Sequence, residues 1–150
     1  MTTPQAHSIN PTTGQLISTT PFAGEIDIAR ALDSTHQAWR QWRRTSVAHR
    51  AGQLRQLAAA LEQRHEALAA MITQEMGKPI RQARAEVTKC INLCYWYAEN
   101  GPAMLSAQPT MVEHQQAVVE YRPLGPVLAV MPWNFPLWQV LRGAVPMLLA

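Results

Sequence analysis

The last 28 residues of the chain, from Pro123 to Ala150, carry only one charged side chain, Arg142. Residues 1–100 hold 19 of the 23 charged residues. A single domain of 150 residues still exposes about 30% of the surface of its unfolded chain, and that surface needs polar cover. We therefore expect the apolar end to be covered by further chain, by a partner or by lipid.

The composition narrows the class of protein. A hydrophobic content of 47% excludes a disordered chain, and 150 residues suit one ordinary domain. The net charge is only +3, and no nucleic-acid motif is present, so we expect no nucleic-acid partner. A basic run is interpreted as a solvated helix end, with an anion or partner contact as the alternative: Arg40, Arg43, Arg44 and Arg50.

The two cysteines and the histidines offer no metal site. Cys90 and Cys94 are four residues apart in a helical pattern, so they share a face without forming a C-x-x-C motif. We expect both to be reduced thiols buried in the core. The five histidines form no set with ligand spacing, so no metal is predicted. The first residues lack the basic and apolar regions of a secretory signal, which favours a cytoplasmic protein.

The first hundred residues predict a hairpin followed by helices. A turn is indicated by the segment Asn10-Pro11-Thr12-Thr13-Gly14, because proline and glycine favour turn conformations. This turn predicts a hairpin over 8–22. Helices are expected over 24–100. A first apolar stripe runs from Ile28 to Trp42. A second helical region begins after Ser46, breaks near 63–65 and ends at Gly77. A third covers 80–99 and ends at Asn100-Gly101-Pro102.

Beyond Pro102 the pattern changes to strands. Residues 109–122 predict a hairpin, with strands at 110–113 and 117–121 around 114–116. Val127–Met131 is an uninterrupted apolar run, typical of a strand buried on both faces of a parallel sheet. A loop and a helix from about 135 to 149 follow, so 126–150 is interpreted as the first half of a β-α-β unit. The neighbours of such a strand would have to lie beyond Ala150.

Residues 126–150 are also long enough to span a membrane. Pro132, Pro136 and Pro146 would each interrupt a spanning helix and leave backbone groups without partners in hydrocarbon. We therefore favour the strand–loop–helix interpretation and expect no membrane partner.

Two polar residues stand out in this apolar region. Asn134, at the junction of strand and helix, could be the N-cap of the helix, or it could donate its side-chain amide to an oxyanion at the carboxyl end of the strand. Arg142 could be a rim arginine, or it could bind a carboxylate. Phe135, Gln139 and Arg142 have the spacing i, i+4, i+7 and so share one helix face.

The motif Pro132-Trp133-Asn134-Phe135-Pro136, preceded by Pro123-Leu124-Gly125, strongly resembles the NAD(P)-dependent aldehyde dehydrogenase superfamily. Asn10–Gly14 and Met76-Gly77-Lys78-Pro79 are similar to two further landmarks of that family, in the same order. The resemblance covers the whole chain and is closest to bacterial members that act on succinate semialdehyde. It implies an α/β fold: hairpins, a helical layer, and the first strand and helix of a Rossmann-like cofactor-binding sheet.

The resemblance also implies roles for residues. NAD or NADP would lie along Val130, Met131, Pro132, Trp133 and Asn134. Asn134 would be catalytic, donating to the oxyanion of a thiohemiacetal. Phe135, Gln139 and Arg142 would face the substrate, with Arg142 holding the distal carboxylate of succinate semialdehyde.

The resemblance is to the opening third of a family member. The cysteine nucleophile and the glutamate base of the family match no position here, and Cys90 and Cys94 do not fit the nucleophile motif. We therefore expect aldehyde oxidation in the complete enzyme and an inactive chain by itself. The 109–122 hairpin resembles the family's oligomerisation strands, which implies a homodimer or homotetramer. The alternative is a non-catalytic subunit or partner-binding fragment.

Overall fold

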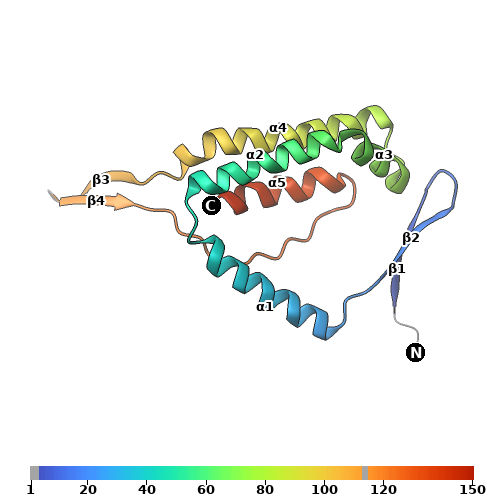
Figure 1. Cartoon of the computed structure of the whole chain (residues 1–150), viewed down its shortest axis with the longest axis horizontal. Coiled ribbons are helices and arrows are strands. Elements are labelled where there is room, and N and C mark those ends of the chain that lie inside the picture. The colour runs from blue at the N-terminus through green and yellow to red at the C-terminus, as the bar shows by residue number, and fades with distance from the viewer. Residues whose placement is uncertain (1–3, 113–114) are drawn as a thin grey trace.

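A layer of helices forms the body of the protein. The computed structural model describes residues 4–112 and 115–150. The long helix α4 (Ile80–Met104) packs against α2 (Val47–Gln63), α3 (His65–Met76) and α5 (Pro136–Leu149) (Figure 1). The apolar stripes predicted for the second and third helical regions meet in this layer. The core they form is Ala51, Leu54, Ala58, Leu61, Ala69, Ile72, Ala83, Val87, Cys90, Ile91, Cys94, Ala98, Leu141, Val145 and Leu149.

The N-terminal hairpin is present as predicted. Strands β1 (Gln5–Ile9) and β2 (Leu16–Pro21) pair antiparallel. In the turn between them, Asn10 Oδ1 accepts hydrogen bonds from the backbone N–H groups of Thr12 (2.8 Å) and Thr13 (3.2 Å). Gly14 takes a positive φ of 72°, a conformation that glycine adopts without steric cost.

The start of α2, the break between α2 and α3 and the end of α3 also lie where the sequence predicts them. Ser46 Oγ caps α2 by accepting a hydrogen bond from the backbone N–H of His49 at 3.1 Å. The predicted break falls at Arg64, and α3 ends at Gly77, which has a left-handed φ of 72°. In the basic run, Arg40, Arg43 and Arg44 are exposed, but Arg50 is buried, so the solvated interpretation is wrong for Arg50.

Helix α4 is longer than predicted. The expected end at Asn100-Gly101-Pro102 is wrong, because α4 continues through Pro102 to Met104. Pro102 has no N–H for the carbonyl of Ala98, four residues earlier. That carbonyl instead accepts a hydrogen bond from Arg55 Nη2 of α2 at 3.2 Å. A donor from a neighbouring helix thus removes part of the cost of proline inside a helix.

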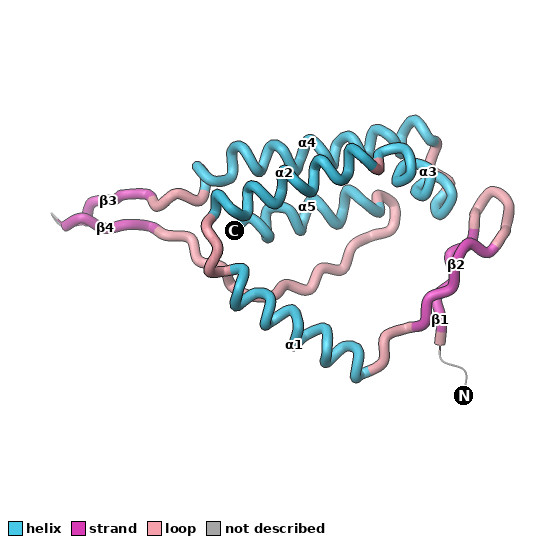
Figure 2. Tube along the Cα trace, in the orientation of Figure 1, coloured by secondary structure: helices cyan, strands magenta, loops and turns pink. Residues whose placement is uncertain are grey.

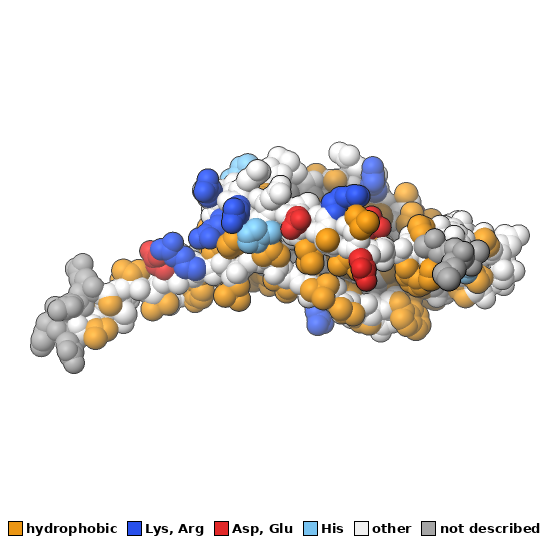
Figure 3. Space-filling view, turned by 90° about the horizontal axis from the view of Figure 1, so that it is seen from below, with side chains coloured by type: hydrophobic (Ala, Val, Ile, Leu, Met, Phe, Trp, Pro, Cys, Tyr) orange, Lys and Arg blue, Asp and Glu red, His pale blue; other side chains and the backbone are white. Residues whose placement is uncertain are grey.

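Helix α1 (Glu25–Trp42) matches its prediction in position but not in burial. None of its residues is buried, and Ile28 and Leu32 of the predicted stripe are 51% and 65% exposed. The end of the stripe reaches the layer, where Trp42 Nε1 donates to the carbonyl of Leu148 at 2.8 Å. Viewed from the side of α1, the molecule shows extensive apolar surface (Figure 3).

The second hairpin projects from the end of the helical layer (Figure 1). Strands β3 (Gln108–Val112) and β4 (Gln115–Val119) pair antiparallel, with Val112 opposite Gln115. The predicted turn at 114–116 is therefore placed too late, because Gln115 and Gln116 already belong to β4. Residues 113 and 114 lie outside the described residues. The predicted strand over 117–121 has the right length but is shifted by two residues, since β4 runs from Gln115 to Val119.

The predicted strand at Val127–Met131 is wrong. Residues 120–132 form no helix or strand, and Figure 2 draws this stretch as loop. Leu128 and Val130 are 90% and 87% exposed. The physical reason is that a parallel strand exists only beside a hydrogen-bonded neighbour, and the two sheets among the described residues are the hairpins. The segment passes instead between α1 and α5.

Within the described part of the chain, no helix is both long enough and apolar enough to cross a membrane.

Candidate active site

The predicted site residues lie on the loop that enters α5 and on the helix itself. Asn134 is exposed, and the N-cap of α5 is Phe135, which makes no side-chain capping bond. The N-cap role for Asn134 is therefore wrong. The alternative, a side-chain amide available to a ligand, is compatible with its exposure.

A glutamate from α4 caps α5 in place of Asn134. Glu86 Oε1 accepts hydrogen bonds from the backbone N–H groups of Leu137 and Trp138, both at 3.0 Å. These are two of the N–H groups that the first turn of a helix leaves without internal partners, and the positive end of the helix dipole favours a carboxylate there. Glu86 is only 3% exposed, so the first turn of α5 is tied to the core of the helical layer.

The buried carboxylate has a buried counter-charge. Lys78 Nζ forms an ion pair and hydrogen bond with Glu86 Oε2, and Lys78 is 7% exposed. The same ammonium lies 3.7 Å from the centroid of the Phe135 ring, a cation–π distance. Lys78 thereby joins three elements: its own turn after α3, Glu86 on α4 and Phe135 at the start of α5.

Glu86 and Lys78 are site residues that the sequence patterns did not predict. A signal was present for Glu86, because its position in α4 is next to Val87 and three residues after Ala83, on the apolar face. A charged residue on a buried face needs a partner. For Lys78 the only hint was its place in the Met76–Pro79 landmark.

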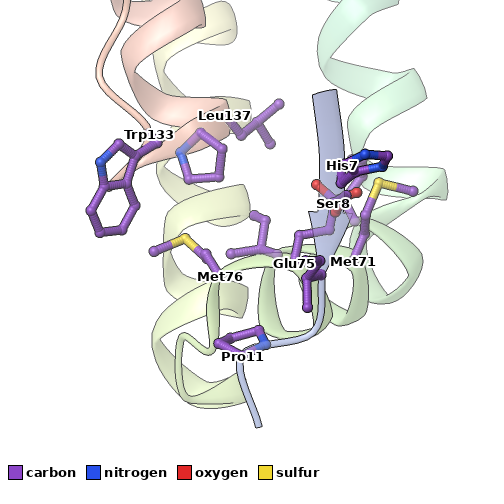
Figure 4. A pocket seen from close by; sticks show the side chains of 12 residues that line it. His7, Ser8, Pro11, Met71, Glu75, Met76, Trp133 and Leu137 are labelled. Carbon is purple, nitrogen blue, oxygen red and sulfur yellow. The ribbon is translucent and has the colours of Figure 1, made fainter. Parts of the chain in front are cut away.

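An open cavity of about 750 Å³ lies between β1, α3 and the start of α5 (Figure 4). Trp133 and Leu137 line it from the α5 side, and Met71 and Glu75 line it from α3. Trp133 is 76% exposed. Of the residues predicted for cofactor and substrate, Trp133 alone lines this cavity among the described residues.

The other predicted cofactor residues lie along the loop that precedes α5. Val130, Pro132 and Asn134 are exposed. Met131 lines a second, apolar cavity of about 500 Å³ between α1, residues 125–131 and α5. A Cβ atom on Gly143 would lie 2.8 Å from Met131 Cε, so the glycine allows this loop to approach α5 closely.

The three predicted substrate residues are on α5 or at its start, as their spacing requires. Phe135 is 44% exposed, Gln139 is half-buried and Arg142 is exposed. None of the three lines either of the two cavities described above. Their role in binding substrate therefore stays a prediction.

Cys90 and Cys94 are free and buried, as predicted. Burial, with a smaller contribution from the charge of Glu86, raises the pKa of the Cys90 thiol to about 12, and burial raises the pKa of Cys94 to about 11. Both are therefore protonated near neutral pH and are poor nucleophiles. In residues 4–112 and 115–150, no cluster of three or more His, Cys, Asp or Glu side chains could hold a metal ion.

Comparison with known proteins decides the family. The family model described as "Aldehyde dehydrogenase family" matches residues 2–150, almost the entire chain. The chain belongs to the aldehyde dehydrogenase family. It is 61% identical over 150 residues to a succinate semialdehyde dehydrogenase [NAD(P)+] of Escherichia coli (strain K12), covering 99% of this chain and 32% of the relative. The chain thus spans about a third of the length of the curated relatives it matches.

Solved structures place the fold in the same family. A succinic semialdehyde dehydrogenase from Streptococcus pyogenes, in complex with NADP⁺, has a TM-score of 0.90 at 29% identity, with 95% of this chain and 32% of that chain covered. Aldehyde dehydrogenase 21 from Physcomitrella patens, in complex with succinate, also has a TM-score of 0.90 at 29% identity, with 98% and 32% covered. The expected fold class, the N-terminal portion of an aldehyde dehydrogenase, is confirmed.

Proposed function

We propose that this chain supplies the oxyanion donor and parts of the cofactor and substrate sites of an NAD(P)⁺-dependent enzyme that oxidises succinate semialdehyde to succinate. The observation that carries the proposal is the exposed amide of Asn134 at the start of α5, whose first turn is held by a buried carboxylate. The 61% identity to the E. coli succinate semialdehyde dehydrogenase supports the substrate.

The loop before α5 suits the flat rings of a nicotinamide dinucleotide. Val130 and Trp133 on this loop expose apolar and aromatic surface. We propose that Val130, Met131, Pro132, Trp133 and Asn134 line NAD or NADP. When bound, the nicotinamide accepts the hydride that leaves the aldehyde carbon. The loop carries no cation from Pro123 to Leu141, so the phosphates would be held by other residues.

Asn134 acts on the carbonyl oxygen of the aldehyde. A nucleophile that adds to the carbonyl carbon drives negative charge onto that oxygen, and the side-chain N–H of Asn134 donates a hydrogen bond to it. A donor that is already positioned stabilises this charge without reorganising, and the loss of one such donor costs about 10²–10³ in rate. Cys90 and Cys94 are not the nucleophile, because both thiols are buried and protonated.

Arg142 recognises the far end of the substrate. It is the one cation on a helix whose other described side chains are uncharged, and a guanidinium binds a carboxylate through two parallel hydrogen bonds. We place Phe135 beside the aldehyde chain and Gln139 between Phe135 and Arg142 on the same face. This arrangement selects an aldehyde with a distal carboxylate.

The test uses a chimera in which these 150 residues replace the matching third of the E. coli relative. We expect the chimera to reduce NAD⁺ or NADP⁺ with succinate semialdehyde, and the 150-residue chain by itself to give no turnover. Asn134→Ala should lower kcat by about 10²–10³ and change KM little. A folded chimera without activity would overturn the proposal in favour of a non-catalytic subunit.

Arg142→Leu tests the substrate. We expect the variant chimera to raise KM for succinate semialdehyde by about tenfold or more, with little change for an uncharged aldehyde of similar length. Gln56→Leu, an exposed position on α2, is the control and should change neither constant. Equal effects of Arg142→Leu on the two aldehydes would reject carboxylate recognition.

We further propose a cytoplasmic homodimer or homotetramer. The free thiols of Cys90 and Cys94 suit a reducing compartment. The β3–β4 hairpin supports assembly, because it projects from the body and exposes Met111 and Val118 by 71% and 58%.

A further inference from the structure

The entry to α5 has no cap of its own. Phe135 offers no side-chain acceptor, and Pro136, the first residue of the helix, has no N–H. Leu137 and Trp138 are thus the first backbone donors of the helix. Both donate to one oxygen, Glu86 Oε1, which belongs to a residue about 50 positions earlier in the chain. The start of α5 is therefore located by tertiary structure.

The second oxygen of Glu86 extends this link. Oε2 pairs with Lys78 Nζ, and Lys78 lies against the face of the Phe135 ring at 3.7 Å. The side chains of Lys78 and Glu86 are 6% and 1% exposed, so water does not screen the pair. One buried carboxylate and one buried ammonium thereby hold both the backbone after Phe135 and the ring of Phe135 itself.

We propose that Glu86 and Lys78 are positioning residues that set the direction of the Asn134 amide. Asn134 directly precedes Phe135, so its backbone direction follows from where Phe135 and the first turn of α5 are held. The inference rests on the proposed function, in which Asn134 donates to the carbonyl oxygen. An ion pair that only stabilised the fold would not affect catalysis by molecules that remain folded.

The chimera described above provides the test. We expect Glu86→Ala and Lys78→Met each to lower kcat by about 100-fold, because a displacement of about 1 Å at a reacting group costs that much. KM should change less than threefold. All measurements are made at a temperature where circular dichroism shows each variant fully folded. The loss should be the same for succinate semialdehyde and for an uncharged aldehyde, since Asn134 acts on the carbonyl and not on the distal carboxylate.

A matched control separates positioning from stability. Arg84 of α4, two residues before Glu86, makes a two-armed ion pair with Glu66 of α3 at the surface. Arg84→Met should leave kcat of the folded chimera unchanged. The double variant Lys78→Met with Glu86→Gln removes both buried charges and keeps an amide oxygen for Leu137 and Trp138. The kcat of this double variant should be at least tenfold higher than the kcat of Glu86→Ala.

Hydrogen–deuterium exchange provides a readout that does not need activity. The amides of Leu137 and Trp138 should exchange at least tenfold faster in Glu86→Ala than in the unsubstituted chimera, and Arg84→Met should leave them protected. Faster exchange with unchanged kcat would overturn the positioning role and leave only a structural cap. An unsubstituted chimera that folds but does not oxidise aldehydes would instead refute the proposed function, a result distinct from any change among variants.

Discussion

At the scale of single residues, the cysteines of α4 show how burial decides chemistry. Cys90 and Cys94 have the residue type of a nucleophile, but the pKa of each thiol is raised, to about 12 and about 11. A thiol is reactive only as the thiolate, so raising the pKa removes reactivity near neutral pH. The two residues therefore contribute to the packing of the core.

This predicts slow labelling of both cysteines. The ordinary pKa of 9.0 leaves about a tenth of a thiol ionised at pH 8, and the raised values lower that fraction by about 100-fold for Cys94 and about 1000-fold for Cys90. The rate of alkylation by iodoacetamide, followed by mass spectrometry, should be lower by these factors in the folded protein and should rise with pH up to about 11 for Cys94 and about 12 for Cys90. In guanidinium chloride both cysteines should react at ordinary rates. Rapid labelling of the folded chain at pH 8 would contradict the burial described.

At the scale of elements, the contact of α4 with α5 depends on a glycine. Gly101 is buried, and a Cβ at this position would clash with Leu149 Cδ2. The missing side chain lets the last turn of α5 rest on the backbone of α4. Pro102, next to it, is tolerated because Arg55 reaches the carbonyl of Ala98.

Gly101→Ala should therefore destabilise the protein. Alanine favours a helix over glycine by up to about 1 kcal/mol, but the clash with Leu149 costs more, and we expect a net loss of about 1–3 kcal/mol in the free energy of unfolding. Gly52→Ala in α2 is the matched control, because no atom lies within 4 Å of its Cβ position. It should leave stability unchanged or raise it slightly. Urea unfolding of both variants makes the comparison, and equal effects would show that Leu149 moves aside freely.

At the scale of the whole molecule, much apolar surface remains open. Helix α1 buries no residue, Leu128 and Val130 are almost fully exposed, and the β3–β4 hairpin projects away from the helical layer. Exposed apolar patches of this kind mark surfaces that contact other protein. An unpaired strand edge has the same consequence, because its backbone donors and acceptors remain available to another chain.

The hairpin provides a prediction on assembly. In the chimera, Val118→Lys places a charge on an exposed apolar position of β4, and we expect sedimentation velocity to show a shift from dimer or tetramer to smaller species. Gln56→Lys, on the exposed side of α2, is the control and should leave the oligomer intact. If Val118→Lys sediments like the unsubstituted chimera, assembly does not use this face of the hairpin.

The sequence by itself determined the elements whose signals are local. The Asn10–Gly14 turn, the Ser46 cap, the break at Arg64 and the stop at Gly77 each depend on neighbouring residues, and each lies where it was predicted. The motif from Pro132 to Pro136 also indicated the family, which comparison confirmed.

Only the tertiary structure decided what depends on distant partners. Residues 127–131 have the pattern of a buried strand, but a strand needs a neighbour to hydrogen-bond, and the described residues provide none beside it. Helix α4 continues beyond Pro102 because Arg55 of α2 donates the hydrogen bond to the carbonyl of Ala98 that Pro102 cannot donate. The cap of α5 comes from Glu86, which is paired with Lys78, and not from Asn134, because a buried charge needs a partner that only the tertiary fold brings close.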